Sequence, residues 1–384
     1  MHYGDSSPLV WQRLGDLSTD LFAMGLHREP EDPDDVPFFL QECRRKMFAA
    51  AYRNDKSLAT YFGRPPRIPL QYSDVRPPLD ISDESLMAEG QNMDAALSSL
   101  DENGWNTEQK IWPAGFVRVR YIMSHFREEI LELSLGNGRT DTESKLIDIS
   151  HRCRLTWESL PGHLHYEPGC WETDRPPTQC LMLLAIYLDY LNSEFHIQRL
   201  LCRFSQAATQ DLLKTSNQML TTVMILIKQH SLTHKLQRDY AWIPKVLFYG
   251  VSSAGVLVTE LCRSMRTGES LPTSMSRSEL IRNLSVLISY LEWVTRPGDG
   301  NHAACSEASK MLARILDEAL DPQTTSSNAQ SSQPILEPAR NEATLGPVED
   351  QLMLEPNVTD TLPMDSEAFL DWFDSVDWNN PMGF

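Results

Sequence analysis

The segment SRSELIRNLSVLISYLEWVTRPGDG, residues 276–300, decides the fold class of this 384-residue chain. Ser276 and Glu279 have the spacing of a capping box, in which each side chain accepts a hydrogen bond from the other residue's free backbone N–H. Pro297 and Gly298 predict the end of the helix. Between these signals, apolar side chains recur at the three- and four-residue spacing of one helical face: Leu280, Leu284, Leu287, Leu291 and Val294.

Helical spacing extends over most of the chain. Further helices are predicted at Glu42 to Phe62, Pro113 to Leu135, Leu146 to Trp157, Thr178 to Phe204, Asp211 to His230, Trp242 to Met265 and Asn301 to Leu320. Gly63 suits the left-handed position that follows a last helical turn. No sustained polar–apolar alternation bounded by hairpin turns occurs. We therefore predict an all-α, multi-helix domain of about eight to ten helices over residues 1–320.

Composition and charge restrict the class of protein. The chain is 41% hydrophobic and its net charge is −19, which disfavours direct contact with polyanionic DNA. Its seven cysteines are scattered, so their spacing builds no zinc ribbon, finger or CxxC motif. The longest apolar run, Cys180 to Leu188, is far shorter than the ~20 residues of a membrane span. We expect a soluble intracellular protein without membrane contact and without a bound cofactor.

The negative charge is concentrated towards the C-terminus. From Asp321 onward there are twelve acids and one base, Arg340, a net charge of −11, which leaves −8 for residues 1–320. Within this region TTSSNAQSSQP, residues 324–334, is a polar run that buries too little apolar area to offset chain entropy. We therefore predict that residues 321–384 form a disordered linker and an acidic tail.

The last 24 residues, 361–384, combine five acids with a dense set of aromatic rings and contain no Lys or Arg. Repulsion among the acids opposes collapse and keeps the rings available to a partner. Asp365 could cap a helix in which several of these rings share one face. The candidate partner-binding residues are Phe369, Leu370, Trp372, Phe373, Val376 and Trp378.

Acidic residues interleaved with hydrophobic ones are typical of a transcriptional activation segment that folds into a partner's groove. The predicted partner is a coactivator or mediator-type protein, whose basic rim would attract the acids. The alternative is a C-terminal helix that docks back on its own domain.

Three short patterns suggest chemistry, and each has a simpler structural explanation. GVSSAG, residues 250–255, resembles a nucleophile elbow, but whichever serine is the nucleophile, one required glycine is missing. Small residues that allow close helix packing explain it better. The paired carboxylates at 128–129 indicate a solvated helix face. The basic run at 44–46 indicates the polar face of an amphipathic helix.

Two histidine pairs have the spacing of metal ligands. His230 and His234 are four residues apart, and His163 and His165 are two apart. Neither pair has a third ligand at a recognisable spacing, so a surface or capping role is the simpler interpretation. We therefore predict no catalytic, cofactor-binding or metal-binding residues, and a protein that is not an enzyme.

Several separated segments occur in an order found in one known family. They are WQRLGDLSTDLFAMGLHRE (11–29), FLQECRRKMFAAAYRNDKSLATYFGRPPRIP (39–69), WESLP (157–161), the helix 181–199 and SRSELIRNLSVLISYLEWVTRPGDGNHAAC (276–305). Together they resemble the regulatory middle region of fungal zinc-cluster transcription factors. The resemblance covers about residues 8–320. It implies an all-α domain that regulates an adjoining activator, in nuclear proteins that often control metabolic or natural-product gene clusters.

One family feature is missing from the 384 residues. Such factors carry an N-terminal six-cysteine cluster that holds two zinc ions, followed by basic residues that contact DNA, and none occurs here. The resemblance also starts near Pro8, inside the regulatory region. Two expectations stay open. Either an upstream portion supplies the zinc cluster, or the protein reaches DNA only through a partner.

We therefore predict a nuclear transcriptional regulator, an activator of RNA polymerase II genes in a metabolic or secondary-metabolite cluster. One alternative is a DNA-free modulator that pairs with an intact zinc-cluster factor through the helical domain, as a homo- or heterodimer. A remote alternative is a helical enzyme with an unrecognised site.

The predicted linker gives a first test. Limited proteolysis of the purified chain should cut first between Thr324 and Pro334 and release a stable helical fragment, because exposed polar segments are preferred cleavage sites. Mass spectrometry of the fragments locates the cut. Resistance of this segment for as long as the helices would favour the docked-helix alternative.

Overall fold

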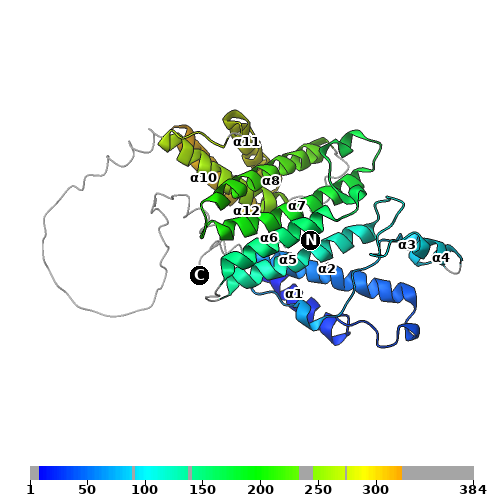
Figure 1. Ribbon diagram of the computed structural model, residues 1–384. Helices are drawn as coiled ribbons and strands as arrows, with labels where there is room; N and C mark the ends of the chain where they lie inside the picture. Colours follow the sequence, from blue (N-terminus) through cyan, green and yellow to red (C-terminus); the bar gives the residue numbers. More distant parts are fainter. Residues whose placement is uncertain (1–7, 89–90, 137–140, 233–244, 273–274, 322–384) are drawn as a thin grey trace, which may run out of the picture.

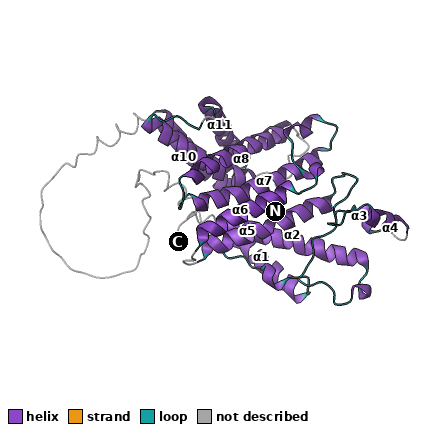
Figure 2. Cartoon of the chain, viewed as in Figure 1, coloured by secondary structure: helices purple, strands orange, loops and turns teal. Residues whose placement is uncertain are grey.

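The computed structural model describes residues 8–88, 91–136, 141–232, 245–272 and 275–321. In these ranges the elements are helices joined by loops, with no strand (Figure 2). The α-helices are α1 (Pro8–Ala23), α2 (Phe38–Phe62), α3 (Asp83–Leu86), α4 (Gln91–Ser98), α5 (Pro113–Leu135), α6 (Thr142–Glu158), α7 (Pro177–Leu201), α8 (Ala207–Leu232), α10 (Ser252–Thr267), α11 (Arg277–Trp293) and α12 (His302–Leu320).

Shorter helical turns complete the described structure. A π-helical segment, Val246–Val251, leads directly into α10. Single 3-10 turns occur at Pro33–Asp35, Leu70–Tyr72, Gly162–Leu164 and Pro168–Glu172.

The all-α prediction is confirmed, and most predicted helices begin and end within a few residues of the observed ones. Helix α5 has the predicted bounds, and α11 begins one residue after and ends two residues before the helix predicted at Ser276 to Thr295. The short helices α3 and α4 were not predicted, and residues 246–251, inside the helix predicted at Trp242 to Met265, are π-helical. Helices of one or two turns show too little periodicity to be recognised in a sequence. The division into residues 1–320 and 321–384 stays a prediction, because 322–384 lie outside the described residues.

Helix α7 lies at the centre of the fold. Figure 1 shows α1 and α2 on one side of the molecule, α10 and α11 on the other, and α5 to α7 between them. Helix α7 contacts α5, α6 and α8. Ile186 and Ile197 belong to a core shared with α5 and α6, whereas Leu184, Leu188 and Phe195 belong to a larger core shared with α8 and α10 to α12. A helix with apolar residues on all sides must be buried in this way.

The helix ends agree only partly with the predicted capping. Gly63 follows α2 in the left-handed conformation (φ 58°), and its N–H reaches the carbonyls of Ala59 and Thr60, as predicted. Ser276 is the N-cap of α11, also as predicted, but its side chain makes no capping hydrogen bond. The hydroxyl lies 3.0 Å from that of Ser278 instead. The predicted capping box is therefore wrong, although the start of the helix is right.

The segment Val246–Thr267 is long and apolar enough to cross a membrane by length and composition alone. In the fold, however, 78% of its apolar window is buried against other helices. Burial of that extent is expected of a helix in a protein core, so its composition is explained by packing.

Helix α11 supplies a test of the packing. Leu284 and Leu291 are at most 1% exposed, whereas Arg282 lies on the outer face. Leu291→Asp places an unpaired charge in the core and should cost several kcal/mol, comparable to the whole stability of a domain. We expect the cooperative thermal transition to be lost. Arg282→Ala should leave it nearly unchanged, and equal tolerance of both substitutions would contradict the observed register of α11.

Candidate functional site

The predicted partner-binding residues lie outside the described part of the chain. Phe369, Leu370, Trp372, Phe373, Val376 and Trp378 all fall within residues 322–384. The structure therefore does not test this site. The described chain ends at Asp321, directly after α12.

A buried charge cluster lies at the centre of the described helices. Asp189 of α7 accepts hydrogen bonds from Arg120 Nε at 2.6 Å and from Arg53 Nη2 at 3.2 Å. The Tyr249 hydroxyl donates to the same carboxylate at 2.6 Å, and Arg127 donates to the Asp189 backbone carbonyl at 3.1 Å. Burial and the neighbouring carboxylate raise the pKa of Tyr249, so this hydroxyl keeps its proton and acts as a donor. We call Arg53, Arg120, Arg127 and Asp189 the arginine cluster.

The arginine cluster connects elements that are distant in sequence. Arg53 belongs to α2, Arg120 and Arg127 to α5, Asp189 to α7, and Tyr249 to the π-helical segment. A buried carboxylate is tolerated only when cations and hydrogen-bond donors surround it. The cluster therefore fixes the position of α2 and α5 against the C-terminal helices.

A second buried cluster holds the turn after α2. Lys56 Nζ lies 2.8 Å from Asp55 and 3.3 Å from Glu128, and both Lys56 and Asp55 are completely buried. Asp55 accepts the backbone N–H of Arg67 and Ile68 at 2.9 and 3.0 Å. Glu128 accepts that of Leu70 at 3.0 Å. These hydrogen bonds hold residues 67–70, which follow the turn at residues 63–66, against α2 and α5.

Two sequence interpretations are corrected by these contacts. Glu128 was expected on a solvated helix face, yet it is 8% exposed and also accepts the Tyr52 hydroxyl. Arg45, in the basic run expected on a polar face, has a side chain that is only 12% exposed. It pairs with Glu29 at 2.7 Å and with the fully buried Glu42. In both cases the charge is buried together with its partners, which come from α2 and the loop after Ile68 for Glu128 and from Glu29 and Glu42 for Arg45.

GVSSAG, residues 250–255, packs as the sequence predicted. All six residues are buried, and a Cβ at Gly250 would lie 3.1 Å from a methyl group of Val223 in α8. Ser253 donates to the backbone carbonyl of Tyr249 at 2.8 Å. Its hydroxyl is therefore engaged within the helix.

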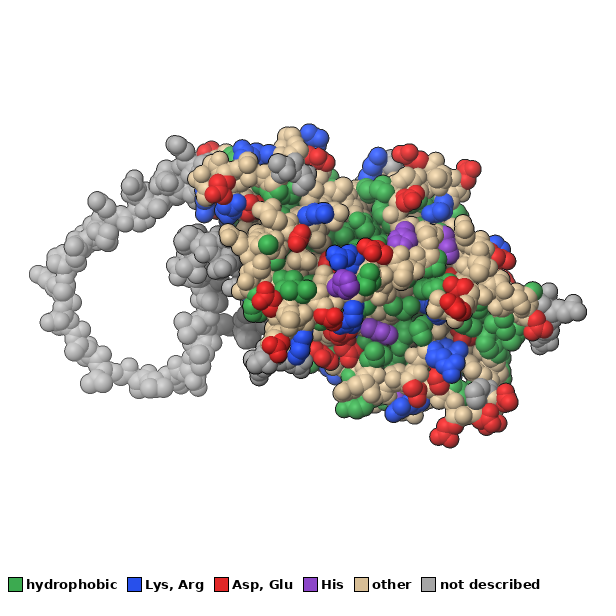
Figure 3. All heavy atoms as spheres, in the orientation of Figure 1, with side chains coloured by type: hydrophobic (Ala, Val, Ile, Leu, Met, Phe, Trp, Pro, Cys, Tyr) green, Lys and Arg blue, Asp and Glu red, His purple; other side chains and the backbone are tan. Residues whose placement is uncertain are grey.

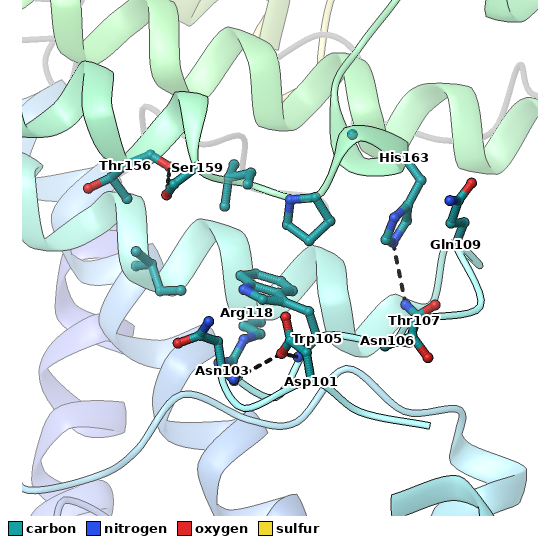
Figure 4. Close-up of a pocket in the computed structure, with 14 residues that line it drawn as sticks. Asp101, Asn103, Trp105, Asn106, Thr107, Gln109, Arg118, Thr156, Ser159 and His163 are labelled. Carbon is teal, nitrogen blue, oxygen red and sulfur yellow. Dashed lines mark hydrogen bonds between the residues drawn. The ribbon is translucent and has the colours of Figure 1, made fainter. Parts of the chain in front are cut away.

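A polar pocket of about 710 Å³ opens between the loop 101–109, α5 and the end of α6 (Figure 4). In Figure 4 the Trp105 ring lies beside Arg118, whose guanidinium is 4.5 Å from the ring centroid. His163 approaches the amide of Asn106, with 3.4 Å between Nε2 and Nδ2. Burial lowers the pKa of His163, which favours the neutral ring.

The polar groups around this pocket mainly hold loops in place. Arg118 donates to the carbonyls of Pro77, Pro78 and Asn103. Asp80, behind the pocket, accepts from the backbone and side chain of Asn106. It lies so close to α5 that any Cβ at Gly115 would collide with its carboxylate. Burial raises the pKa of Asp80. These contacts stabilise the fold, and among the described residues around this pocket no hydroxyl or thiol is hydrogen-bonded to a histidine or carboxylate.

Neither the histidine pairs nor the cysteines form a metal centre in the described part of the chain, where no group of three His, Cys, Asp or Glu side chains is placed to hold an ion. The seven cysteines are free thiols, and five of them are buried. The side chains of His230 and His234 lie outside the described residues.

Comparison with known proteins finds a family match in the N-terminal part of the chain. Residues 7–149 match the family model described as "Fungal specific transcription factor domain". The chain is 20% identical over 196 residues to the "Pyrrolocin cluster transcription factor fsdR" of Fungal sp. (strain NRRL 50135), covering 51% of this chain and 24% of that protein. It is 32% identical over 84 residues to "Transcription factor asR3" of Sarocladium schorii, covering 22% of this chain and 10% of that protein. No solved structure matches.

Residues 7–149, from α1 into α6, are thus similar to a fungal specific transcription factor domain, and over this segment the resemblance predicted from the sequence is confirmed. Both relatives are named as transcription factors. The chain spans about a quarter or less of the length of the curated relatives that it matches.

The two buried charge clusters could not be found by reasoning from the sequence. Arg53 and Asp189 are 136 positions apart, and Tyr52 and Glu128 are 76 apart. The one available signal was Asp189 itself, a single acid that ends the apolar run Cys180 to Leu188 inside a predicted helix. Its partners become apparent only when α2, α5 and α7 are brought together.

Burial of His125 predicts a specific acid sensitivity. The ring packs edge-on against Tyr52 and Tyr121, and burial lowers its pKa from 6.5 to about 4. Between these pH values the unfolded chain takes up a proton that the folded chain does not. The free energy of unfolding should therefore fall by on the order of 3 kcal/mol as the pH falls through this window. His125→Phe should remove much of that loss in urea titrations at pH 6.5 and 4.

His151→Gln is the matched control, because this histidine is exposed on α6. It should retain the wild-type pH dependence. Some dependence should persist in every variant, since burial also lowers the pKa of His196 to about 3. Equal pH dependence in His125→Phe and wild type would contradict the expected contribution of His125.

Proposed function

We propose that this chain is the regulatory and activating part of a nuclear fungal transcription factor. The helical domain regulates, and the C-terminal tail recruits a coactivator or mediator-type protein. The match of residues 7–149 to a fungal transcription factor domain is the observation that carries the proposal. The tail adds five acids and a set of aromatic rings within the last 24 residues. This composition suits a segment that folds into a hydrophobic groove with a basic rim.

The target genes are proposed from the relatives. One is named a transcription factor of the pyrrolocin cluster. By analogy, we propose that this protein activates genes of a metabolic or secondary-metabolite cluster. This step rests on 20% identity and on about a quarter of that protein's length, so it concerns the class of target genes only.

We propose that the described helices do not bind DNA themselves. The chain has a net charge of −19. On the face shown in Figure 3, Lys and Arg are interspersed with Asp and Glu and form no continuous basic field. Since affinity for DNA depends on clustered cations, a zinc cluster or a DNA-binding partner would supply it. In the alternative function, the chain is a modulator that pairs with an intact zinc-cluster factor, and co-purification with such a factor would support it.

The tail provides the test of activation. Asn357–Phe384 fused to an unrelated DNA-binding module should drive a reporter gene. Changing both Trp372 and Phe373 to Ala should abolish most of the signal, because buried aromatic anchors contribute about 2 kcal/mol or more each at such interfaces.

The matched control changes Asn357 and Ser375 to Ala, because Asn357 precedes the predicted helix and Ser375 lies away from its aromatic face. This variant should activate like the wild type at equal protein levels. A wild-type fusion that is expressed but silent would contradict activation by the tail. Equal losses in both double variants would contradict the role of the aromatic face.

A further inference from the structure

A second pocket, of about 410 Å³, lies where α1 and α2 meet the π-helical segment. Its volume is within the range of small-molecule sites in proteins. Its walls are mainly apolar: Val10, Leu14, Leu17, Leu58, Tyr61, Leu247 and Phe248. We call it the junction pocket, because α1, α2 and α5 form one side and residues 245–249 and Asn301 form the other.

The charged groups of the junction pocket all have the same sign. Arg13, Arg53, Arg120 and Lys245 line it, and no Asp or Glu does among the described residues. Arg13 pairs with Asp16 on the exposed face of α1, and Asp189 contacts both Arg53 and Arg120, so a single carboxylate balances only one of the charges of these two arginines. The inner end of the pocket is therefore a partly buried site of positive potential with apolar walls.

Two of these arginines retain donors that the described structure does not use. Arg120 donates only through Nε, to Asp189, which leaves both terminal nitrogens without an acceptor. The Nε atom of Arg53 is buried and also has no hydrogen-bond partner. An unsatisfied donor that is buried, as Arg53 Nε is, is costly, whereas the terminal nitrogens of Arg120 are not among the buried unpaired atoms. An anion with two oxygens is the group that best satisfies a guanidinium.

The wall opposite α2 has an unusual backbone. Leu247, Phe248 and Tyr249 lie in the π-helical segment Val246–Val251. Such segments are rare and frequently occur at functional sites. Here the segment presents Phe248 to the pocket and at the same time directs the Tyr249 hydroxyl to Asp189.

We propose that the junction pocket binds a small organic carboxylate with an apolar body. The carboxylate would be held by Arg120 and Arg53, and the body by the leucine and aromatic walls. A small molecule is favoured over a peptide helix because the volume of about 410 Å³ is smaller than a helix of several turns requires. The inference does not depend on the proposed activation by the tail.

Calorimetry on the full 384-residue chain tests this proposal with octanoate and 2-naphthoate as probes. Their amides, octanamide and 2-naphthamide, serve as uncharged controls of equal shape. At least one carboxylate should bind saturably, and its amide should bind at least tenfold more weakly. Arg120→Gln should weaken carboxylate binding at least tenfold and leave amide binding unchanged. Leu58→Trp, which fills the pocket, should abolish binding of both.

Two further variants keep the result interpretable. Lys245→Gln removes a charge without touching the arginine cluster, so it tests the charge requirement if Arg120→Gln fails to fold. Arg152→Gln removes an exposed arginine of α6 that pairs with Glu129 and Asp148, and it should bind like the wild type.

Three outcomes would overturn the proposal: no saturable binding of either carboxylate to the folded wild-type chain, equal binding of acid and amide, or unchanged binding in Leu58→Trp. Saturable binding of the synthetic peptide 361–384 that Leu58→Trp abolishes, with no binding of the carboxylates, would also overturn it. The junction pocket would then be a docking site for the tail.

Discussion

The buried carboxylate of Asp189 is the constraint on which the arrangement of the helices depends. It stands in α7, which packs against helices on several sides, and its side chain is 6% exposed. An isolated carboxylate in such surroundings would cost more than the 5–15 kcal/mol by which a domain is usually stable. The fold is therefore acceptable only if other elements bring cations and donors to this point. Helices α2 and α5 and the π-helical segment do so.

This requirement makes the packing cooperative. If α2 moved away, Asp189 would lose Arg53, and Lys56 would separate from Glu128. Breaking a buried ion pair by removing one partner typically costs about 3–5 kcal/mol. Two such losses would approach the stability of the whole domain. The matched segment 7–149 and the C-terminal helices therefore form one cooperative assembly through α2, α5 and α7.

The helices could be predicted from short sequence patterns because helix formation depends mainly on residues that are close in sequence. The leucines of α11 recur at helical spacing, and Gly63 occupies the left-handed position that a non-glycine residue adopts only with strain. The charge clusters depend on contacts between distant residues. Glu128 and Glu129 are adjacent and chemically identical, yet Glu128 joins a buried cluster and Glu129 pairs with the partly exposed Arg152. No single-sequence pattern distinguishes them, because the difference lies in which helix each one faces. The tail residues were chosen by composition alone, and they stay a prediction.

The junction pocket and the arginine cluster share Arg53 and Arg120, and this has a consequence for regulation. A ligand carboxylate on the remaining donors of these guanidiniums would share their positive charge with Asp189, so its binding would alter how firmly α2 and α5 are held to α7. A ligand shifts a conformational equilibrium only through such a difference in affinity between states. Asn301, at the start of α12, also lines the pocket, and the predicted tail follows the other end of that helix. Along the chain, helix α12 therefore joins the pocket to the segment proposed to activate transcription.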